Sequence, residues 1–187
     1  MEIEIEFFTY WHCGSGSSGG SRVDSLVAKD NGLPYIPAKT IKGHIREIAE
    51  YLEDCDFVNE CFGGSSNDGK DGKEKDICFD VKYKGKEGKC YFSNAIIKED
   101  IDKSLHSYLF TTISSTKIEE NGIAKTGSLR EIEVVVPLKL YATIEFENDV
   151  KEEYKKKMIK AFKQIKRIGL NRTRGLGRCE IREVKND

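Results

Sequence analysis

Residues 132–168, IEVVVPLKLYATIEFENDVKEEYKKKMIKAFKQIKRI, carry the clearest strand pattern of the chain, followed directly by a helical one. Every second residue up to Phe146 is apolar, which is typical of a β-strand with one face in the core. Pro137 interrupts this run and cannot donate a ladder hydrogen bond, so we expect a bulge, an edge or two strand segments there. From Asp149 onward, apolar residues recur at helical spacing, and Gly169 is positioned to end that helix.

The rest of the sequence surrounds this unit with further strands and one more helix. Alternating glutamate and apolar residues predict a first strand over residues 2–8, and apolar residues at helical spacing predict an amphipathic helix over residues 39–54. Two short strands are expected over residues 77–83 and 89–97, and a last strand over 178–184. This order is typical of an α+β, ferredoxin-like (RRM-like) βαββαβ fold, which hosts many unrelated functions.

Length and composition suit one soluble domain over residues 1–187, with a polar, glycine-rich insertion at about 55–76. The formal net charge is only -1, which argues against a protein that coats nucleic acid through bulk electrostatics. Any contact with RNA is therefore expected to be local, and residues 163–182 are the most basic stretch. Neither an export signal nor a long apolar run is visible, so we expect a cytoplasmic protein without membrane contact.

The six cysteines contain no CxxC pair. In a reducing compartment, free thiols are the expected state. A subset of four is close enough along the chain to hold one tetrahedral zinc ion, namely Cys55, Cys61, Cys78 and Cys90.

Several further segments contain motifs that are informative together. Residues 11–47, WHCGSGSSGGSRVDSLVAKDNGLPYIPAKTIKGHIRE, combine a glycine loop, an aspartate, a Pro-x-Ile-Pro turn and a Lys-Gly-x-x-Arg helix start. Residues 59–64, NECFGG, precede CYFSNAII at 90–97, and IGLNRTRGLGRCEI at 168–181 is a second glycine-rich loop. Together these segments resemble the RAMP superfamily of CRISPR-associated proteins, and within it the backbone subunits of type III effector complexes.

This resemblance implies a function in RNA-guided defence. It implies that the chain binds guide RNA and paired target RNA, contacts other effector subunits and associates with further copies of itself along the RNA. It also implies a thumb-like hairpin at about 108–131, where Asn121-Gly122 is a good turn signal. Asp24 matches the aspartate that cleaves target RNA, with a divalent cation (Mg²⁺) as the expected cofactor. From the residues alone, an Asx-type loop cap is the favoured interpretation of Asp24, and only the resemblance favours catalysis over it.

RNA contacts are expected where cations, hydrogen-bond donors or glycines accompany a helix start or a loop. The helix start near residue 39, the hairpin and the second glycine loop meet this description, and His12 matches a family position beside the RNA path. The predicted RNA-binding residues are His12, Lys39, Lys42, Gly43, Arg46, Lys125, Arg130, Asn171, Arg172, Arg174, Gly175 and Gly177.

Two alternatives to a cleaving backbone subunit stay open. One is a RAMP protein that binds RNA without cutting it. The other is a stand-alone endoribonuclease that processes repeat RNA without metal, with His44 or His12 as general acid or base. All RNA-binding hypotheses share one geometric expectation, which is that Lys42, Arg46 and Arg174 face a common groove.

Overall fold

The computed structural model describes residues 1–14, 16, 23–52, 54–65 and 76–184. Its main sheet has four antiparallel strands in the order β4-β7-β1-β8. Their bounds are Glu2–Phe7 (β1), Cys90–Phe92 (β4), Lys139–Phe146 (β7) and Cys179–Val184 (β8). With one helix after β1 and another after β7, this is the ferredoxin-like arrangement, so the predicted fold class is confirmed.

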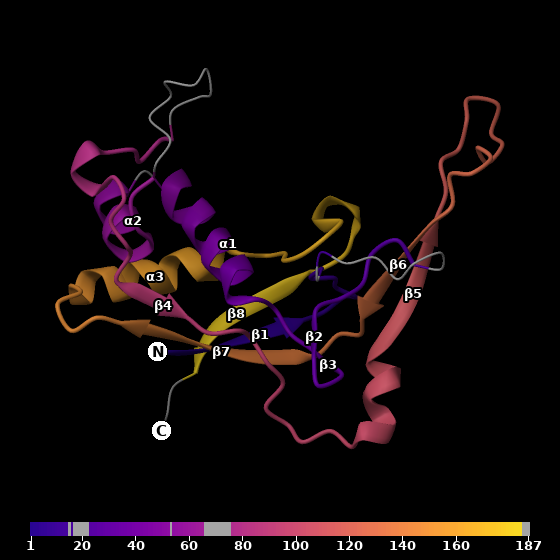
Figure 1. The fold of residues 1–187 in the computed structure, drawn as a ribbon, viewed down its shortest axis with the longest axis horizontal. Helices are drawn as coiled ribbons and strands as arrows, with labels where there is room; N and C mark the ends of the chain where they lie inside the picture. The colour runs from indigo at the N-terminus through magenta and orange to yellow at the C-terminus, as the bar shows by residue number, and fades with distance from the viewer. Residues whose placement is uncertain (15, 17–22, 53, 66–75, 185–187) are drawn as a thin grey trace.

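The helices pack together on one face of this sheet (Figure 1). They are α1 (Ala38–Tyr51), α2 (Cys55–Phe62) and α3 (Glu152–Gln164). The predicted apolar stripe of α1 is buried at Ile41, Ile45 and Ala49, which meet the buried face of β1 in a single core. Within the described ranges, none of the helices combines the length and the apolar character needed to cross a bilayer.

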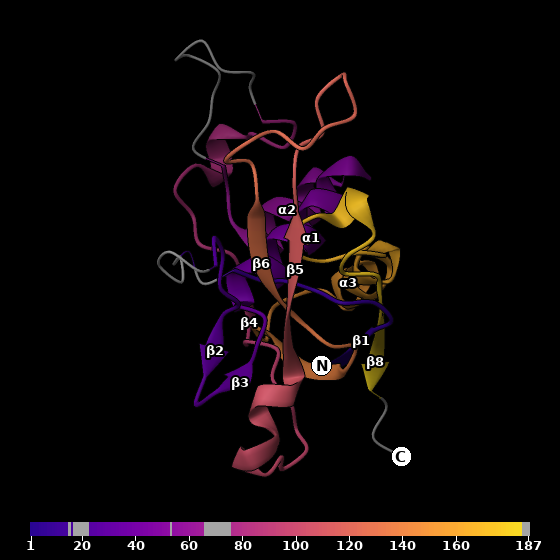
Figure 2. The same cartoon turned by 90° about the vertical axis from the view of Figure 1, so that its right-hand side faces the viewer.

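A two-stranded hairpin leaves the main sheet between β4 and β7. It consists of β5 (Phe110–Ser115) and β6 (Arg130–Val135), and it projects away from the helices in Figure 1 and lies in front of them in Figure 2. Pro137 lies between β6 and β7, so the apolar run of residues 132–146 is divided between two sheets. Of the outcomes expected at Pro137, the structure shows two strand segments. The remaining short elements are β2 (Lys29–Asp30), β3 (Leu33–Pro34), η1 (Val81–Tyr83), η2 (Lys103–Leu109) and η3 (Arg172–Arg174).

Two local predictions need correction. Residues 77–83 are not a strand, because Val81–Tyr83 form a 3-10 helix that Asp80 caps by accepting from the Lys82 N–H at 2.8 Å. The first part of the predicted insertion is the helix α2, which buries Phe57 and Phe62 in the core. Residues 66–75 of that insertion lie outside the described residues.

Candidate functional site

Asp24 is held at the edge of the hairpin by backbone pairing. Its N–H donates to the Glu131 carbonyl at 2.8 Å, and the Glu131 N–H donates to its Oδ2 at 2.8 Å. Ser25 continues this pairing: it forms a parallel β-bridge with Ile132, and its carbonyl accepts from the Glu133 N–H at 3.1 Å. One carboxylate oxygen of Asp24 therefore caps β6, while the side chain as a whole remains exposed.

His12 lies beneath this segment and is buried, with 2% of its surface exposed. Its Nδ1 is 2.6 Å from the Glu133 carbonyl oxygen, and its Nε2 is 3.0 Å from the Ser25 hydroxyl. A protonated Nδ1 donates to the carbonyl and leaves Nε2 to accept from Ser25. The structure thus buries His12 inside the protein, where it positions the segment that carries Asp24.

We expect His12→Ala to lower the free energy of unfolding by about 2–4 kcal/mol, because it leaves a buried carbonyl and a hydroxyl without partners. Urea denaturation measures this change. The matched control is His106→Ala, since His106 is only partly buried and its Nε2 contacts the Ile101 carbonyl at 3.1 Å. Equal urea midpoints for the two variants would contradict the positioning role of His12.

Asp24 opens onto a cavity of about 750 Å³ between the hairpin and the second glycine loop. We call this cavity the hairpin groove and define it by Asp24, Lys117, Lys125, Arg130 and Arg174. Four cations from two separate parts of the chain thus line the same cavity as one carboxylate. Such a site attracts a phosphate while leaving an acid beside it.

The second glycine loop, residues 168–178, is closed by backbone contacts. The Ile168 N–H donates to the Gly177 carbonyl at 2.9 Å, and the Gly177 N–H donates to the Tyr10 carbonyl at 2.8 Å. Gly177 has a φ of +70°, and a Cβ there would lie 1.9 Å from the Ile168 carbonyl oxygen. Gly175 also has a positive φ, but a side chain there would meet open space. Gly177 is therefore a packing requirement, whereas Gly175 lies on the projecting part of the loop.

Of the three arginines of this loop, Arg172 and Arg174 contact different parts of the protein. Arg174 lines the hairpin groove, and together with Arg130 and Asn171 it lines a second hollow of about 580 Å³. Arg172 turns toward α1, where Nη1 donates to His44 Nδ1 at 3.2 Å. Burial, and next the charge of Arg172, lower the pKa of His44, so its ring is neutral at neutral pH and accepts this bond.

The start of α1 is only partly available to a ligand. The Ala38 N–H donates to Asn94 Oδ1 at 2.8 Å, which uses one free donor of the helix end. Lys39 and Gly43 are exposed and Lys42 is half-buried. In the part of the chain that the structure describes, none of these lines the hairpin groove.

Arg46 is engaged within the protein. Its Nε is 2.6 Å from Glu50 Oε1, and its Nη1 donates to the Gly63 carbonyl at 3.3 Å. It therefore braces α1 against the end of α2. The expectation that Lys42, Arg46 and Arg174 share a groove is not met, because Arg174 lines the hairpin groove with Arg130 and Asp24, whereas Lys42 and Arg46 do not. The structure therefore does not support an RNA track shared by the start of α1 and the glycine loop, which leaves the hairpin groove alone as the basis for an RNA site.

The predicted zinc ligands are arranged as two pairs. Cys55 and Cys78 form a disulfide, which corrects the expectation that all cysteines are free. Cys61 is buried beside Cys90, and its pKa is raised by a hydrogen bond with Cys90 and by burial. Among the described residues, no group of three or more His, Cys, Asp or Glu side chains is placed to hold a metal ion. The structure thus does not assemble the predicted four-cysteine set.

Comparison with known proteins places this arrangement in a family. The model of the RAMP superfamily matches residues 4–180. The chain belongs to the RAMP superfamily. Among curated proteins, none is significantly similar to this RAMP protein.

Solved structures share its fold. One is described as a cryo-EM structure of the Type III-B Cmr-beta bound to cognate target RNA, with a TM-score of 0.71 and 13% identity over 97% of this chain and 95% of the other. Another, of Type III-B Cmr-beta in the apo state, has a TM-score of 0.67 and 14% identity over 99% of this chain and 97% of the other.

Sequence reasoning missed the residues that support the site of this RAMP protein. Glu133 accepts from the Val27 N–H at 3.0 Å and from Lys29 Nζ at 2.7 Å, which fixes the segment after Asp24 on the hairpin. In the sequence, Glu133 is one of the polar residues that alternate with the apolar side of a strand. No local signal marks it, because its partners lie more than 100 positions away.

Proposed function

We propose that this RAMP protein is an RNA-binding backbone subunit of a type III CRISPR effector complex. The observation that carries the proposal is the hairpin groove, where Arg130 of the hairpin, Arg174 of the glycine loop and Asp24 of the N-terminal segment line one cavity. Family membership and the shared fold with Cmr-beta chains support the same function. Its partners are then guide RNA, target RNA, other effector subunits and further copies of the chain.

RNA would be held mainly through its backbone. Arginine and lysine side chains at the groove supply charged donors for phosphate oxygens, and such contacts carry no sequence information. Base pairing between guide and target would supply the specificity, as in other RNA-guided complexes. A local groove of this kind agrees with the small net charge of -1, because strong affinity needs only a few well-placed cations.

The exposed Asp24 carboxylate gives the groove a group for RNA cleavage. As a general base it would accept the proton of a ribose 2′-hydroxyl while the 2′-oxygen forms a bond to the adjacent phosphorus. The bond from phosphorus to the 5′-oxygen then breaks, and that oxygen takes a proton from water. Arg130 and Arg174 would stabilise the charge on the phosphate oxygens.

A divalent cation fits this site only in part. Mg²⁺ is commonly held by one or two carboxylates together with phosphate oxygens and water, and Asp24 is the carboxylate that the groove offers. When bound, Mg²⁺ would supply Lewis-acid stabilisation of the phosphate.

A second candidate is a RAMP subunit that binds RNA without cutting it. The hydrogen bond from the Glu131 N–H to Asp24 Oδ2, at 2.8 Å, favours this alternative, because the carboxylate then has a structural role that does not need catalysis. His12, one of the two histidines considered for metal-independent cleavage, is buried with both ring nitrogens engaged.

We expect the double variant Arg130→Gln, Arg174→Gln to weaken binding of single-stranded RNA about 10-fold or more, because two charged hydrogen bonds to phosphate are lost. The plot of log affinity against log salt should also become shallower by about 0.7 for each lost phosphate contact. Fluorescence anisotropy with labelled RNA measures both. Lys103→Gln, an exposed cation on η2, is the control. An affinity of the double variant equal to that of Lys103→Gln would refute the groove as the RNA site.

A further inference from the structure

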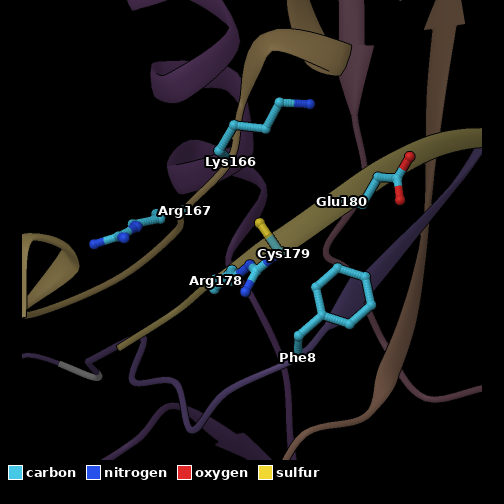
Figure 3. Close-up of a pocket in the computed structure, with 6 residues that line it drawn as sticks. All are labelled: Phe8, Lys166, Arg167, Arg178, Cys179 and Glu180. Atoms are coloured by element: carbon cyan, nitrogen blue, oxygen red, sulfur yellow. The ribbon is translucent and has the colours of Figure 1, made fainter. Parts of the chain in front are cut away.

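A further cationic hollow lies where β1 ends beside the start of β8. It has a volume of about 410 Å³, and the residues around it come from the end of β1, from the segment after α3 and from β8 (Figure 3). We call it the Phe8 hollow. Its lining residues are Phe8, Lys166, Arg167, Arg178, Cys179 and Glu180.

An aromatic ring and a guanidinium group adjoin each other at this hollow. The Phe8 N–H donates to the Arg178 carbonyl at 2.9 Å, which continues the pairing of β1 with β8. Phe8 is nevertheless 46% exposed, and the Arg178 guanidinium carbon lies 5.9 Å from the ring centre. An exposed ring beside a cation is the combination on which single-stranded nucleic acids stack a base and place a phosphate.

Two further cations are held in place by backbone carbonyls. Arg167 Nη1 donates to the Arg172 carbonyl at 2.5 Å, and Lys166 Nζ donates to the Lys163 carbonyl at 2.9 Å. Because an arginine has five N–H donors and a lysine three, each side chain keeps donors for a phosphate oxygen. Fixed cations lose less conformational entropy when they bind a ligand.

The acid of the hollow has its own counter-ion. Glu180 Oε2 accepts from Arg182 Nη2 at 2.6 Å, and this contact lowers the pKa of Glu180. With Glu180 paired to Arg182, the three cations at the hollow are left to attract an anion.

The Phe8 hollow and the hairpin groove are linked by a series of hollows that share arginine residues. Arg167 lines the Phe8 hollow and also a cavity of about 380 Å³ between α1 and the glycine loop. Arg172 lines this cavity and the hollow of about 580 Å³ described above. Arg174 lines the 580 Å³ hollow and the hairpin groove. An arginine is therefore shared by each pair of neighbouring hollows between the hairpin and Phe8, which is the route that we infer for an RNA strand.

The open face of the sheet carries acidic side chains along β1. Glu2, Glu4 and Glu6 alternate along the central strand β1, on the side opposite the buried Ile3 and Ile5. Each of them is paired with a cation: Lys98 with Glu2, Lys139 with Glu4 and Arg182 with Glu6. RNA that crossed this face, as in many sheet-binding modules, would find these three cations already engaged by carboxylates, unlike the cations of the Phe8 hollow.

We propose that the Phe8 hollow is a second RNA subsite, which stacks one unpaired base on Phe8 and holds the adjoining phosphate with Arg167 and Arg178. The proposal rests on the proposed function, since it extends the RNA path beyond the hairpin groove. The ligand is a single-stranded segment, because a base within a duplex cannot present its face to the ring.

The test compares labelled single-stranded RNA of about 20 and about 6 nucleotides, lengths above and within the range that one stacking module covers. We expect Phe8→Ala to weaken binding of the longer RNA at least about fivefold, the lower limit for one lost stacking contact, and to leave the shorter RNA unaffected. Phe8→Tyr should keep wild-type affinity. The control is Tyr91→Ala, which removes an aromatic residue of similar exposure from the opposite edge of the sheet.

Photo-crosslinking gives an independent readout. The longer RNA with 4-thiouridine should crosslink to the peptide that contains Phe8, and Arg178→Gln should reduce that yield. The second subsite alone would be overturned if Phe8→Ala bound the longer RNA with wild-type affinity and the wild-type protein gave no crosslink at Phe8, while Arg130→Gln, Arg174→Gln still weakened binding. Loss of the effect of Arg130→Gln, Arg174→Gln would overturn the proposed function. A change only in self-association of Phe8→Ala would assign the ring to a protein contact and also overturn the subsite.

Discussion

We expect Asp24→Asn to slow target-RNA cleavage by the assembled effector complex about 100-fold or more, the usual contribution of a general base. The asparagine oxygen can still accept from the Glu131 N–H, which is 2.8 Å away in the wild-type protein. The segment therefore keeps its position, whereas the amide can neither take up a proton nor carry the negative charge. Single-turnover cleavage of labelled target RNA measures the rate, and anisotropy checks that RNA binding is retained.

The matched control is Glu131→Gln, which removes a neighbouring carboxylate whose Oε1 accepts from Ser114 Oγ at 3.0 Å. Its cleavage rate should stay close to wild type. Should Asp24→Asn cleave normally while Asp24→Ala does not, Asp24 would be a structural cap. Normal cleavage by both variants would dismiss Asp24 altogether.

The largest expected effect on stability is that of Gly177→Ala. A φ of +70° costs an alanine about 1–2 kcal/mol, and a Cβ at 1.9 Å from the Ile168 carbonyl oxygen adds an overpacking cost of about 1–3 kcal/mol. We therefore expect the free energy of unfolding to fall by about 2–5 kcal/mol. Since the glycine loop carries Arg174, RNA binding should weaken at temperatures where the variant is still folded.

Gly175→Ala is the control for this variant, because Gly175 has a φ of +95° but open space around it. Its free energy of unfolding should fall only by the cost of a positive φ for alanine, about 1–2 kcal/mol. Urea denaturation of both variants separates the two costs. Equal losses would show that the close approach of Gly177 to Ile168 does not contribute.

Much of the fold follows from local periodicity. The patterns that predicted β1, β7, α1 and α3 are long and regular, and each has a clear buried side. The missed helix α2 is only eight residues long and includes polar residues such as Asn59, whose Nδ2 donates to the Cys78 carbonyl at 2.9 Å. A short segment of this kind becomes helical through its tertiary packing, which local propensity does not report.

The candidate site was predicted less well than the fold. Asp24, Lys125, Arg130 and Arg174 do line one groove, which agrees with the family resemblance. His12 and Arg46 were assigned to RNA on residue type and family position. The structure instead gives them partners within the protein, because a histidine or arginine binds whichever acceptor lies nearest after folding.

By itself, the sequence determined the ferredoxin-like class and an interruption of the long apolar run at Pro137. It also located the glycine-flanked cations, because side-chain periodicity and backbone restrictions are properties of neighbouring residues. Only the tertiary structure decided which cations meet Asp24, that His12 is internal, and that Gly177 serves packing. These outcomes depend on contacts such as Asp24 with Glu131 and His12 with Glu133, which join residues 107 and 121 positions apart. Hydrogen-bond partners and burial at such separations arise from the three-dimensional packing of the whole chain.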